Sequence, residues 1–154
     1  MKPRESDAKG RAWALLLTTH ATLVERIEAA LGAADLPPLA WYDVLWELEK
    51  AEDGKMRMSE LAERVVLSRS NLTRLADRLE KAKLLRRESC ADDKRGAYCA
   101  ITKAGLQMRE KMWPVYREQI DLLFGAYLDV EEARTMTQVF EKILRAAKEV
   151  SPPN

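Results

Sequence analysis

The segment LSRSNLTRLADRLEKAKLLRR, residues 67–87, has the clearest periodic pattern in this chain of 154 residues. Its apolar side chains recur at the spacing i, i+3, i+4 and i+7, which predicts a helix with one face buried in a core. We expect Ser68 to cap the start of this helix, because a serine side chain accepts hydrogen bonds from free backbone N–H groups, and we expect the helix to end near Lys83. The predicted buried face consists of Leu72, Leu75, Ala76 and Leu79.

The opposite side of the same predicted helix is polar and mostly basic, with Ser70, Arg74, Asp77, Arg78 and Lys81. Arg74 and Arg78 are four residues apart, and two like charges at that spacing destabilise a helix by about 0.2–0.5 kcal/mol. A partner that supplies phosphate groups would reverse this effect. The alternative is an ordinary solvated face, in which Asp77 forms an ion pair with Arg74 or with Lys81.

A short helix and a hairpin flank this segment. Upstream, Ser59 can cap a short helix that turns Leu61 inward. Downstream, the extended segments 84–90 and 97–102 enclose a charged tip with one glycine, residues 91–96, which predicts a β-hairpin. Two short helices followed by a hairpin form a winged helix-turn-helix, in which the second helix enters the major groove of DNA.

The hairpin tip adds Lys94 and Arg95 to the basic groups of the predicted helix. Residues 64–95 contain ten Lys and Arg against five Asp and Glu, whereas the rest of the chain is net acidic and the whole has a net charge of +1. One basic segment in a near-neutral protein indicates an anionic partner, with nucleic acid first among the candidates. The combination of helix and hairpin favours DNA binding over the solvated-face alternative.

Four further helices are predicted outside this region, and turn-forming residues separate them. Gly32 follows the first helix, Pro37 and Pro38 precede the second, and Asp53 and Gly54 form a turn after it. These helices cover residues 11–32, 38–52, 103–128 and 129–150.

Two capping signals mark the last two helices. Thr102 precedes one of them, and Asp129 and Glu132 have capping-box spacing at the start of the other. The predicted fold is therefore mainly α with a small β-hairpin, in the order of four helices, two strands and two helices: a winged helix-turn-helix plus a helical dimerisation arm. We expect one domain over residues 1–154, with residues 38–103 as its DNA-binding part and residues 11–32 and 104–150 as its helical dimerisation part.

The sequence LAER at residues 61–64, the segment 67–87 and the sequence DDKRGAYCAITKAG at residues 92–105 together resemble the MarR/SlyA family of bacterial transcription regulators. The most specific part is the Asp-x-Arg wing at Asp93 and Arg95, and the flanking helices match the family in order and length. The resemblance implies a homodimer, a pseudo-palindromic operator in double-stranded DNA and, usually, release of the operator when a small molecule binds.

The resemblance also implies roles for individual residues. The residues that would meet the major groove are Ser70, Asn71, Thr73 and Arg74. Arg95 would enter the minor groove of flanking DNA, held by Asp93. Arginine suits guanine or phosphate and asparagine suits adenine, whereas an arginine in a narrow minor groove responds to its shape. The expected DNA contacts are Ser68, Ser70, Asn71, Thr73, Arg74, Arg78, Lys94 and Arg95.

The apolar faces of the terminal helices exceed what a small winged-helix core can cover. We therefore expect a homodimer, since DNA half-sites favour two-fold symmetry. The alternative is a larger intramolecular core. The residues expected at the dimer interface are Leu122, Phe124, Tyr127, Phe140 and Ile143.

A ligand pocket is expected between the dimerisation helices and the winged helix, near Trp13, His20, Trp41 and Trp46. A cleft between two units is a usual place for a ligand, here a small aromatic or amphipathic anion. The alternative is that the tryptophans are packed core and that His20 is a hydrogen-bonded buried group. A lone histidine with distant cysteines cannot build a zinc site, so neither a metal nor another cofactor is expected.

Two cysteines allow a further reading of the function. Cys90 and Cys99 flank the hairpin as candidate cross-strand neighbours, and a disulfide between them would stiffen the wing and gate DNA binding. The alternative is two incidental thiols, with Cys99 packed inward beside Ile101. A helical adaptor that binds no DNA is the remaining alternative on this scaffold.

Other classes of protein are not expected. No catalytic motif is present, which argues against an enzyme. The longest uncharged run, residues 12–24, is too short and too polar to cross a membrane, and the charged start has no secretory signal. We expect a cytoplasmic, nucleoid-associated protein.

Overall fold

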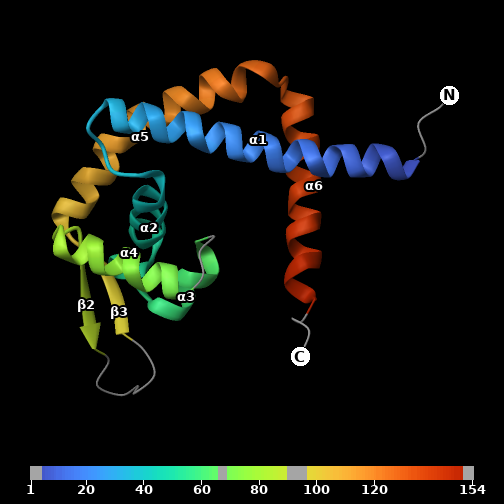
Figure 1. Ribbon diagram of the computed structural model, residues 1–154. Coiled ribbons are helices and arrows are strands. Elements are labelled where there is room, and N and C mark those ends of the chain that lie inside the picture. Colours follow the sequence, from blue (N-terminus) through green and yellow to red (C-terminus); the bar gives the residue numbers. More distant parts are fainter. Residues whose placement is uncertain (1–4, 66–68, 90–96, 151–154) are drawn as a thin grey trace. The chain divides into compact units, whose positions relative to one another are not determined.

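The computed structural model of the chain describes residues 5–65, 69–89 and 97–150. It is mostly helical with a small antiparallel sheet, so the predicted fold class is confirmed (Figure 1). The helices are α1 (Glu5–Ala33), α2 (Leu39–Lys50), α3 (Met58–Arg64), α4 (Arg69–Lys81), α5 (Lys103–Leu123) and α6 (Val130–Glu149). The strands are β1 (Lys55–Arg57), β2 (Leu85–Ser89) and β3 (Ala97–Ile101), and single 3-10 turns lie at Glu52–Gly54 and Gly125–Tyr127.

The chain divides into two compact units, Met1–Arg117 and Glu118–Asn154, with the boundary inside α5. The first unit holds α1 to α4, the sheet and the first part of α5. The second unit holds the end of α5, the second 3-10 turn and α6. All described elements of the winged helix-turn-helix therefore belong to the first unit.

One apolar cluster holds the winged helix-turn-helix together. The predicted face of α4 is buried in it, and α2, α3 and the sheet supply the other members. Full burial of one large aliphatic side chain contributes roughly 1.5–3 kcal/mol, so this cluster fixes which side of α4 faces outward. Its members are Val44, Leu45, Leu48, Met56, Leu61, Val65, Leu72, Leu75, Ala76, Leu79, Leu84, Leu85 and Cys99.

The sheet has three antiparallel strands in the order β1-β3-β2. β2 and β3 form the predicted hairpin, with Leu85 opposite Ile101. The sequence pattern does not predict β1, which pairs with β3 and places the buried Met56 opposite Cys99. A strand of three residues is too short to show a two-residue period, so the sequence pattern carries no signal for β1.

A Schellman motif ends α4. Leu84 N donates to Leu79 O at 2.9 Å and Lys83 N donates to Glu80 O at 2.8 Å. Lys83 adopts the left-handed conformation with a φ of 61°. Leu79 and Leu84 are both buried, which supplies the apolar contact that usually accompanies this motif. The helix therefore ends at Lys81, slightly earlier than predicted, and the chain turns directly into β2.

The turn after α4 is bound to the start of α5. The Thr102 hydroxyl donates to Lys83 O at 2.7 Å and accepts from Gly105 N at 3.0 Å, so the predicted cap is confirmed. Thr102 N also donates to Leu84 O at 3.1 Å. A Cβ atom on Gly105 would lie 2.1 Å from the same Leu84 O, so this close approach requires glycine.

Two helix starts differ from the prediction. α1 begins at Glu5, upstream of residue 11. α3 begins at Met58 with Arg57 as its N-cap and no side-chain cap, so the predicted cap by Ser59 is wrong. The reason is that Arg57 is the last residue of β1, and the helix follows the strand with no linker between them.

The second unit starts its helix α6 as the sequence predicts. Asp129 accepts from Glu132 N at 2.8 Å, and Glu132 accepts from Asp129 N at 3.0 Å, which completes the capping box. The preceding helix α5 ends at Leu123 instead of near residue 128, because the 3-10 turn Gly125–Tyr127 intervenes.

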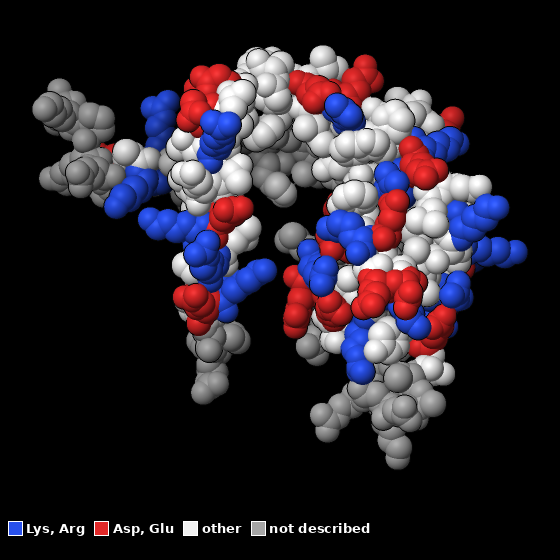
Figure 2. Space-filling view, turned by 180° about the vertical axis from the view of Figure 1, so that it is seen from behind, with Lys and Arg blue, Asp and Glu red and all other residues white. Residues whose placement is uncertain are grey.

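The surface of the described residues is mixed in charge. On the face shown in Figure 2, basic and acidic side chains are interspersed over the molecule. No helix among the described residues is both long enough and apolar enough to cross a membrane.

Candidate nucleic-acid interface

The outward side of α4 carries the predicted DNA-contacting residues. Asn71, Thr73, Arg74 and Arg78 are exposed, because the four apolar residues of the helix occupy its buried side. Ser70 lies in the first turn of α4, and Ser68 lies outside the described residues. The exposed side is completed by Asp77, Glu80 and Lys81.

The acidic residue in the middle of this side is paired with the sheet. Asp77 Oδ1 accepts from Nη2 of Arg87, on β2, at 2.5 Å. The predicted alternative, an ion pair of Asp77 with Arg74 or Lys81 within the helix, is not formed. No carboxylate of the described residues pairs with Arg74 or Arg78, so both guanidinium groups are available to an external anion.

Arg87 makes two further contacts with α4 that sequence patterns did not identify. Its Nη2 also donates to Thr73 O at 3.3 Å, and its backbone N donates to Glu80 Oε2 at 3.0 Å. Thr73, Asp77 and Glu80 have i, i+4, i+7 spacing and form one stripe along the helix. β2 contacts α4 along this stripe, which lies beside Arg74 and Arg78.

The strands of the hairpin are described, whereas its tip is not. Asp93, Lys94 and Arg95 lie outside the described residues, so their predicted contacts remain predictions. Among the described residues next to the tip, Lys55 and Arg57 of β1 lie over the ring of Tyr98 on β3, at 5.8 and 5.2 Å from its centroid. The sheet therefore has a basic and aromatic surface on β1 and β3.

Comparison with known proteins fits this geometry. The model of the MarR family matches residues 34–96, which contain the described helix-turn-helix and β2. AbsC of Streptomyces coelicolor, described as a MarR family transcriptional regulator, has the same fold with a TM-score of 0.84 and is 27% identical, over 97% of this chain and 99% of that one. The chain belongs to the MarR family.

Two further proteins extend the comparison. Sco3205 of Streptomyces coelicolor, a MarR family regulator solved in complex with DNA, shares the fold with a TM-score of 0.85 and 22% identity, over 97% of this chain and 94% of that one. The transcriptional repressor IacR of Pseudomonas putida is 28% identical over 77% of this chain and 70% of its own length. This MarR-family chain is a transcription regulator and not an enzyme.

The predicted ligand-pocket residues of this MarR-family chain have different surroundings. Trp13, 62% exposed, and His20 lie on the exposed part of α1. Trp41 is half-buried against the core. Trp46 stacks on Tyr42, with ring centroids 6.4 Å apart, and remains partly exposed. The structure therefore places two of the four on α1 and two on α2, and their role in binding remains a prediction.

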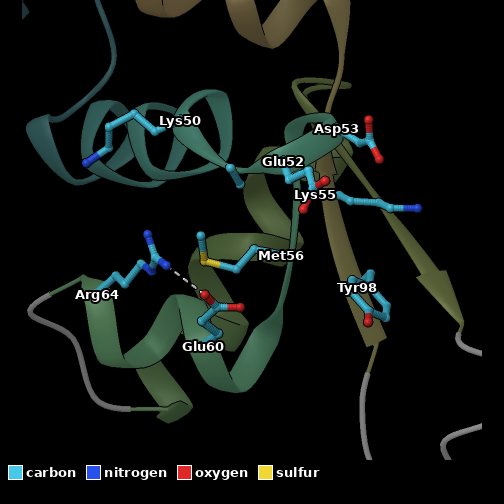
Figure 3. A pocket seen from close by; sticks show the side chains of 9 residues that line it. Lys50, Glu52, Asp53, Lys55, Met56, Glu60, Arg64 and Tyr98 are labelled. Atoms are coloured by element: carbon cyan, nitrogen blue, oxygen red, sulfur yellow. Dashed lines mark hydrogen bonds and ion pairs between the residues drawn. The ribbon is translucent and has the colours of Figure 1, made fainter.

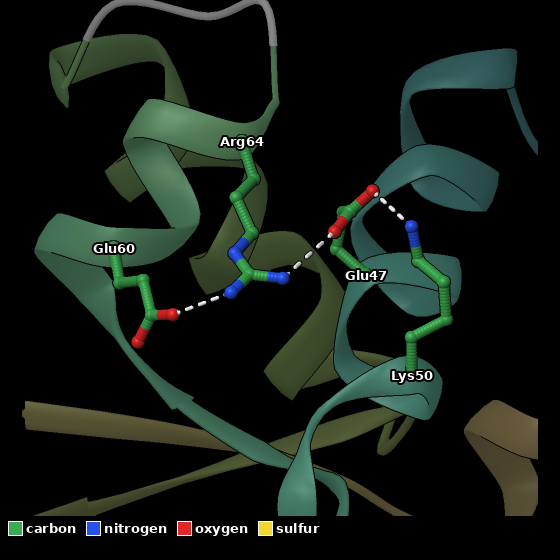
Figure 4. Close-up of polar contacts among 4 residues, drawn as sticks. All are labelled: Glu47, Lys50, Glu60 and Arg64. Carbon is green, nitrogen blue, oxygen red and sulfur yellow. Dashed lines mark hydrogen bonds and ion pairs between the residues drawn. The ribbon is translucent and has the colours of Figure 1, made fainter.

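A separate cavity of about 420 Å³ lies beside the helix-turn-helix (Figure 3). None of the four predicted pocket residues lines it. On its wall, Arg64 pairs with Glu60 at 2.8 Å and with Glu47 at 3.7 Å, and Glu47 also pairs with Lys50 at 2.7 Å (Figure 4). Lys50 and Arg64 both have carboxylate partners, so neither supplies an unpaired cation to the cavity. Its lining is Lys50, Ala51, Glu52, Asp53, Lys55, Met56, Glu60, Arg64 and Tyr98.

Cys99 is buried in the core of the MarR winged helix and faces Arg87 across the β-ladder. The predicted cross-strand pairing of Cys90 with Cys99 is therefore wrong, because the observed register puts another residue opposite Cys99; Cys90 itself lies outside the described residues. The Cys99 thiol contacts Met58 Sδ at 2.9 Å, and burial raises the pKa of the thiol to about 11. A thiol of this kind is a poor redox sensor.

The predicted dimer residues are largely uncovered within one chain. Leu122, Phe124, Tyr127 and Ile143 are exposed, and Phe140 is half-buried. The N-terminal part of α1 likewise exposes apolar side chains, Trp13, Leu15, Leu16 and Leu17.

Proposed function

We propose that this chain is a homodimeric, DNA-binding repressor of transcription that releases its operator when a small molecule binds. The observation that carries the DNA-binding part is the exposed side of α4. It offers Arg74 and Arg78 without a carboxylate partner among the described residues, while Asp77 is paired with Arg87. Two unpaired guanidinium groups on a helix of a winged helix-turn-helix suit phosphate and guanine.

The proposed contacts follow from this placement. Ser70, Asn71, Thr73 and Arg74 lie toward the start of α4, the part of a recognition helix that reads base edges in the major groove. Arg78 is one turn further on and contacts a phosphate. The remaining proposed contacts lie outside the described residues: Ser68, which precedes α4 in the sequence, and Lys94 and Arg95 of the predicted wing, with Asp93 as support.

Selection of DNA tests this proposal directly. The wild-type protein is used to enrich duplexes from a random-sequence library, and affinities for the enriched duplex are measured by fluorescence polarisation at several salt concentrations. Arg74→Ala should relax the preference at one base position by about 1–3 kcal/mol, and Arg78→Ala should lower affinity on all sequences and reduce the salt slope by about one. Arg134→Ala, an exposed arginine on α6, is the matched control. Wild-type affinity in both α4 variants would refute the assignment.

Dimerisation is proposed from the exposed apolar residues of the second unit. A chain that left Leu122, Tyr127, Ile143 and Leu144 in water would expose an unusually large apolar surface, and a second copy is the partner that a two-fold operator requires. Light scattering should give a dimer mass for the wild type. Ile143→Glu with Leu144→Glu should give monomer or aggregate, and Lys142→Ala, an exposed neighbour, should leave the dimer intact.

Ligand release is proposed to involve the tryptophans of α1 and α2. The ligand class is a small aromatic or amphipathic anion near Trp13, His20, Trp41 and Trp46. Such a ligand releases DNA only when it binds the DNA-free conformation more tightly than the DNA-bound one. Salicylate is a suitable probe: it should change tryptophan fluorescence and lower operator affinity over the same concentration range. A regulator of this kind acts at the nucleoid, in the cytoplasm.

A further inference from the structure

We propose that Arg87 is a positioning residue that holds the wing in a fixed orientation to α4, and that Asp77 serves DNA binding through Arg87 and not by touching DNA. This inference rests on the proposed DNA binding and deepens it. It explains why a carboxylate lies next to Arg74 and Arg78 on the surface proposed to face phosphate, where an acidic group on its own weakens binding.

The contacts of Arg87 join two elements that are distant in sequence. Its Nη2 reaches Asp77 Oδ1 at 2.5 Å and Thr73 O at 3.3 Å, and its backbone N reaches Glu80 Oε2 at 3.0 Å. One residue of β2 therefore holds three residues of α4, over two turns of the helix. Because a guanidinium is planar and its donors have fixed directions, a side chain bound in this way restricts rotation of the strand about the helix.

The location of this contact makes it relevant to recognition. β2 is the strand that leads into the wing, and α4 carries Arg74 and Arg78, the proposed contacts in the major groove. A protein that must place a helix and a wing on one half-site binds more tightly when their relative orientation is set before binding. The ion pair is partly exposed, with 28% of the Arg87 side chain and 58% of the Asp77 side chain accessible, so the core does not impose this orientation alone.

The pairing also has an electrostatic consequence. Asp77 is three residues after Arg74, a spacing at which two side chains on a helix are neighbours, so an unpaired carboxylate here would compete with phosphate for Arg74. The guanidinium of Arg87 occupies that carboxylate. Loss of Arg87 therefore removes the positioning contact and at the same time releases a negative charge toward the DNA.

The sign of the Asp77→Ala effect tests the proposal. Removing a negative charge from a phosphate-facing surface tightens binding if that charge has no other role. The proposal expects the opposite: about tenfold weaker binding to the duplex enriched on the wild-type protein, equivalent to about 1.4 kcal/mol. Glu63→Ala, which removes an exposed carboxylate from α3, is the matched control and should leave affinity unchanged or slightly tighter.

A double-mutant cycle separates positioning from direct contact. Arg87→Ala should weaken binding by about tenfold or more, and the double variant with Asp77→Ala should bind no more weakly than Arg87→Ala alone, since residues that act as one unit are not additive. If Arg87 instead touched phosphate, Asp77→Ala would free it and strengthen binding, and the loss on Arg87→Ala would persist in the Asp77→Ala background. Either result overturns the proposal.

Separate control measurements test whether each variant folds and whether the wild type binds DNA. Circular dichroism and urea unfolding identify variants that fold. If Arg87→Ala does not fold, Arg87→Lys, which keeps the charge but not the planar fork, should weaken binding about threefold, and wild-type affinity in that variant would count against the proposal. If the wild type enriches no duplex, DNA binding itself is refuted and the inference falls with it. If the wild type binds and Asp77→Ala binds as tightly or more tightly, only the positioning role is refuted.

Discussion

Replacement of Gly105 with alanine would break the junction between β3 and α5. The added Cβ atom would lie 2.1 Å from Leu84 O and 2.8 Å from Ile101 Cγ1. The isoleucine atom belongs to a side chain that can rotate away. The carbonyl of Leu84 belongs to the backbone and accepts the hydrogen bond of Thr102 N, so either the start of α5 or the start of β2 must shift.

The expected loss is large for a single methyl group. Overpacking of a well-packed site costs typically about 1–3 kcal/mol, and weakening the Thr102–Leu84 hydrogen bond adds about 0.5–1.5 kcal/mol. Alanine has a higher helix propensity than glycine, which offsets this loss of stability by up to about 1 kcal/mol. We therefore expect Gly105→Ala to lower the free energy of unfolding by about 2–3 kcal/mol.

Urea unfolding followed by circular dichroism measures this loss. Protein concentration is held constant, because stability depends on concentration in an oligomer. Gly32→Ala in α1 is the matched control: an added Cβ there has nothing within 4 Å, so this variant should be as stable as the wild type or up to about 1 kcal/mol more stable. If Gly105→Ala were as stable as Gly32→Ala, the described junction would be wrong.

Three further predictions concern single residues. Lys83→Gly should raise stability by up to about 1 kcal/mol, because glycine adopts the left-handed conformation of Lys83 without a steric cost; a lower urea midpoint would contradict the Schellman motif. Asp129→Ala should cost about 1 kcal/mol through loss of the capping box, measured by thermal unfolding, and an unchanged midpoint would mean that the cap does not hold α6. In a Cys90→Ser variant, Cys99 should resist a thiol-reactive disulfide at pH 8 until urea unfolds the chain, since a pKa of about 11 leaves roughly 0.1% thiolate; rapid reaction in the folded state would restore the redox-gated reading.

Local signals in the sequence predicted the central helix and the last helix well. The buried face of α4 follows from the spacing of Leu72, Leu75, Ala76 and Leu79, and the capping box follows from Asp129 and Glu132, because each depends only on residues within two turns. The same locality explains the error at Ser59. A serine before an apolar run is a good cap signal. However, β1 has only three residues and gives no sequence signal, and because it extends to Arg57, α3 begins at Met58, before Ser59.

Local sequence patterns do not predict the contacts between α4 and β2 at the candidate interface. Asp77 and Arg87 are ten residues apart on different elements, and they meet because β2, paired in register with β3, also packs against α4 after the turn at Lys83. Within α4, the spacing of Asp77 to Arg74 and Lys81 gave the more obvious pairing, which the structure does not form. The register of β2 on β3 also places Cys99 opposite Arg87. The spacing of Cys90 and Cys99 in the sequence does not predict this pairing.

The strand order β1-β3-β2 leaves β1 and β2 as the two edges of the sheet. An exposed edge is a template on which another chain can add a strand and start an aggregate, and proteins guard against this with short edge strands and charged residues. β1 has only three residues, two of which are Lys55 and Arg57. On β2, Arg86 is exposed and paired with Glu88. The basic residues of the sheet thus guard both edges against self-association.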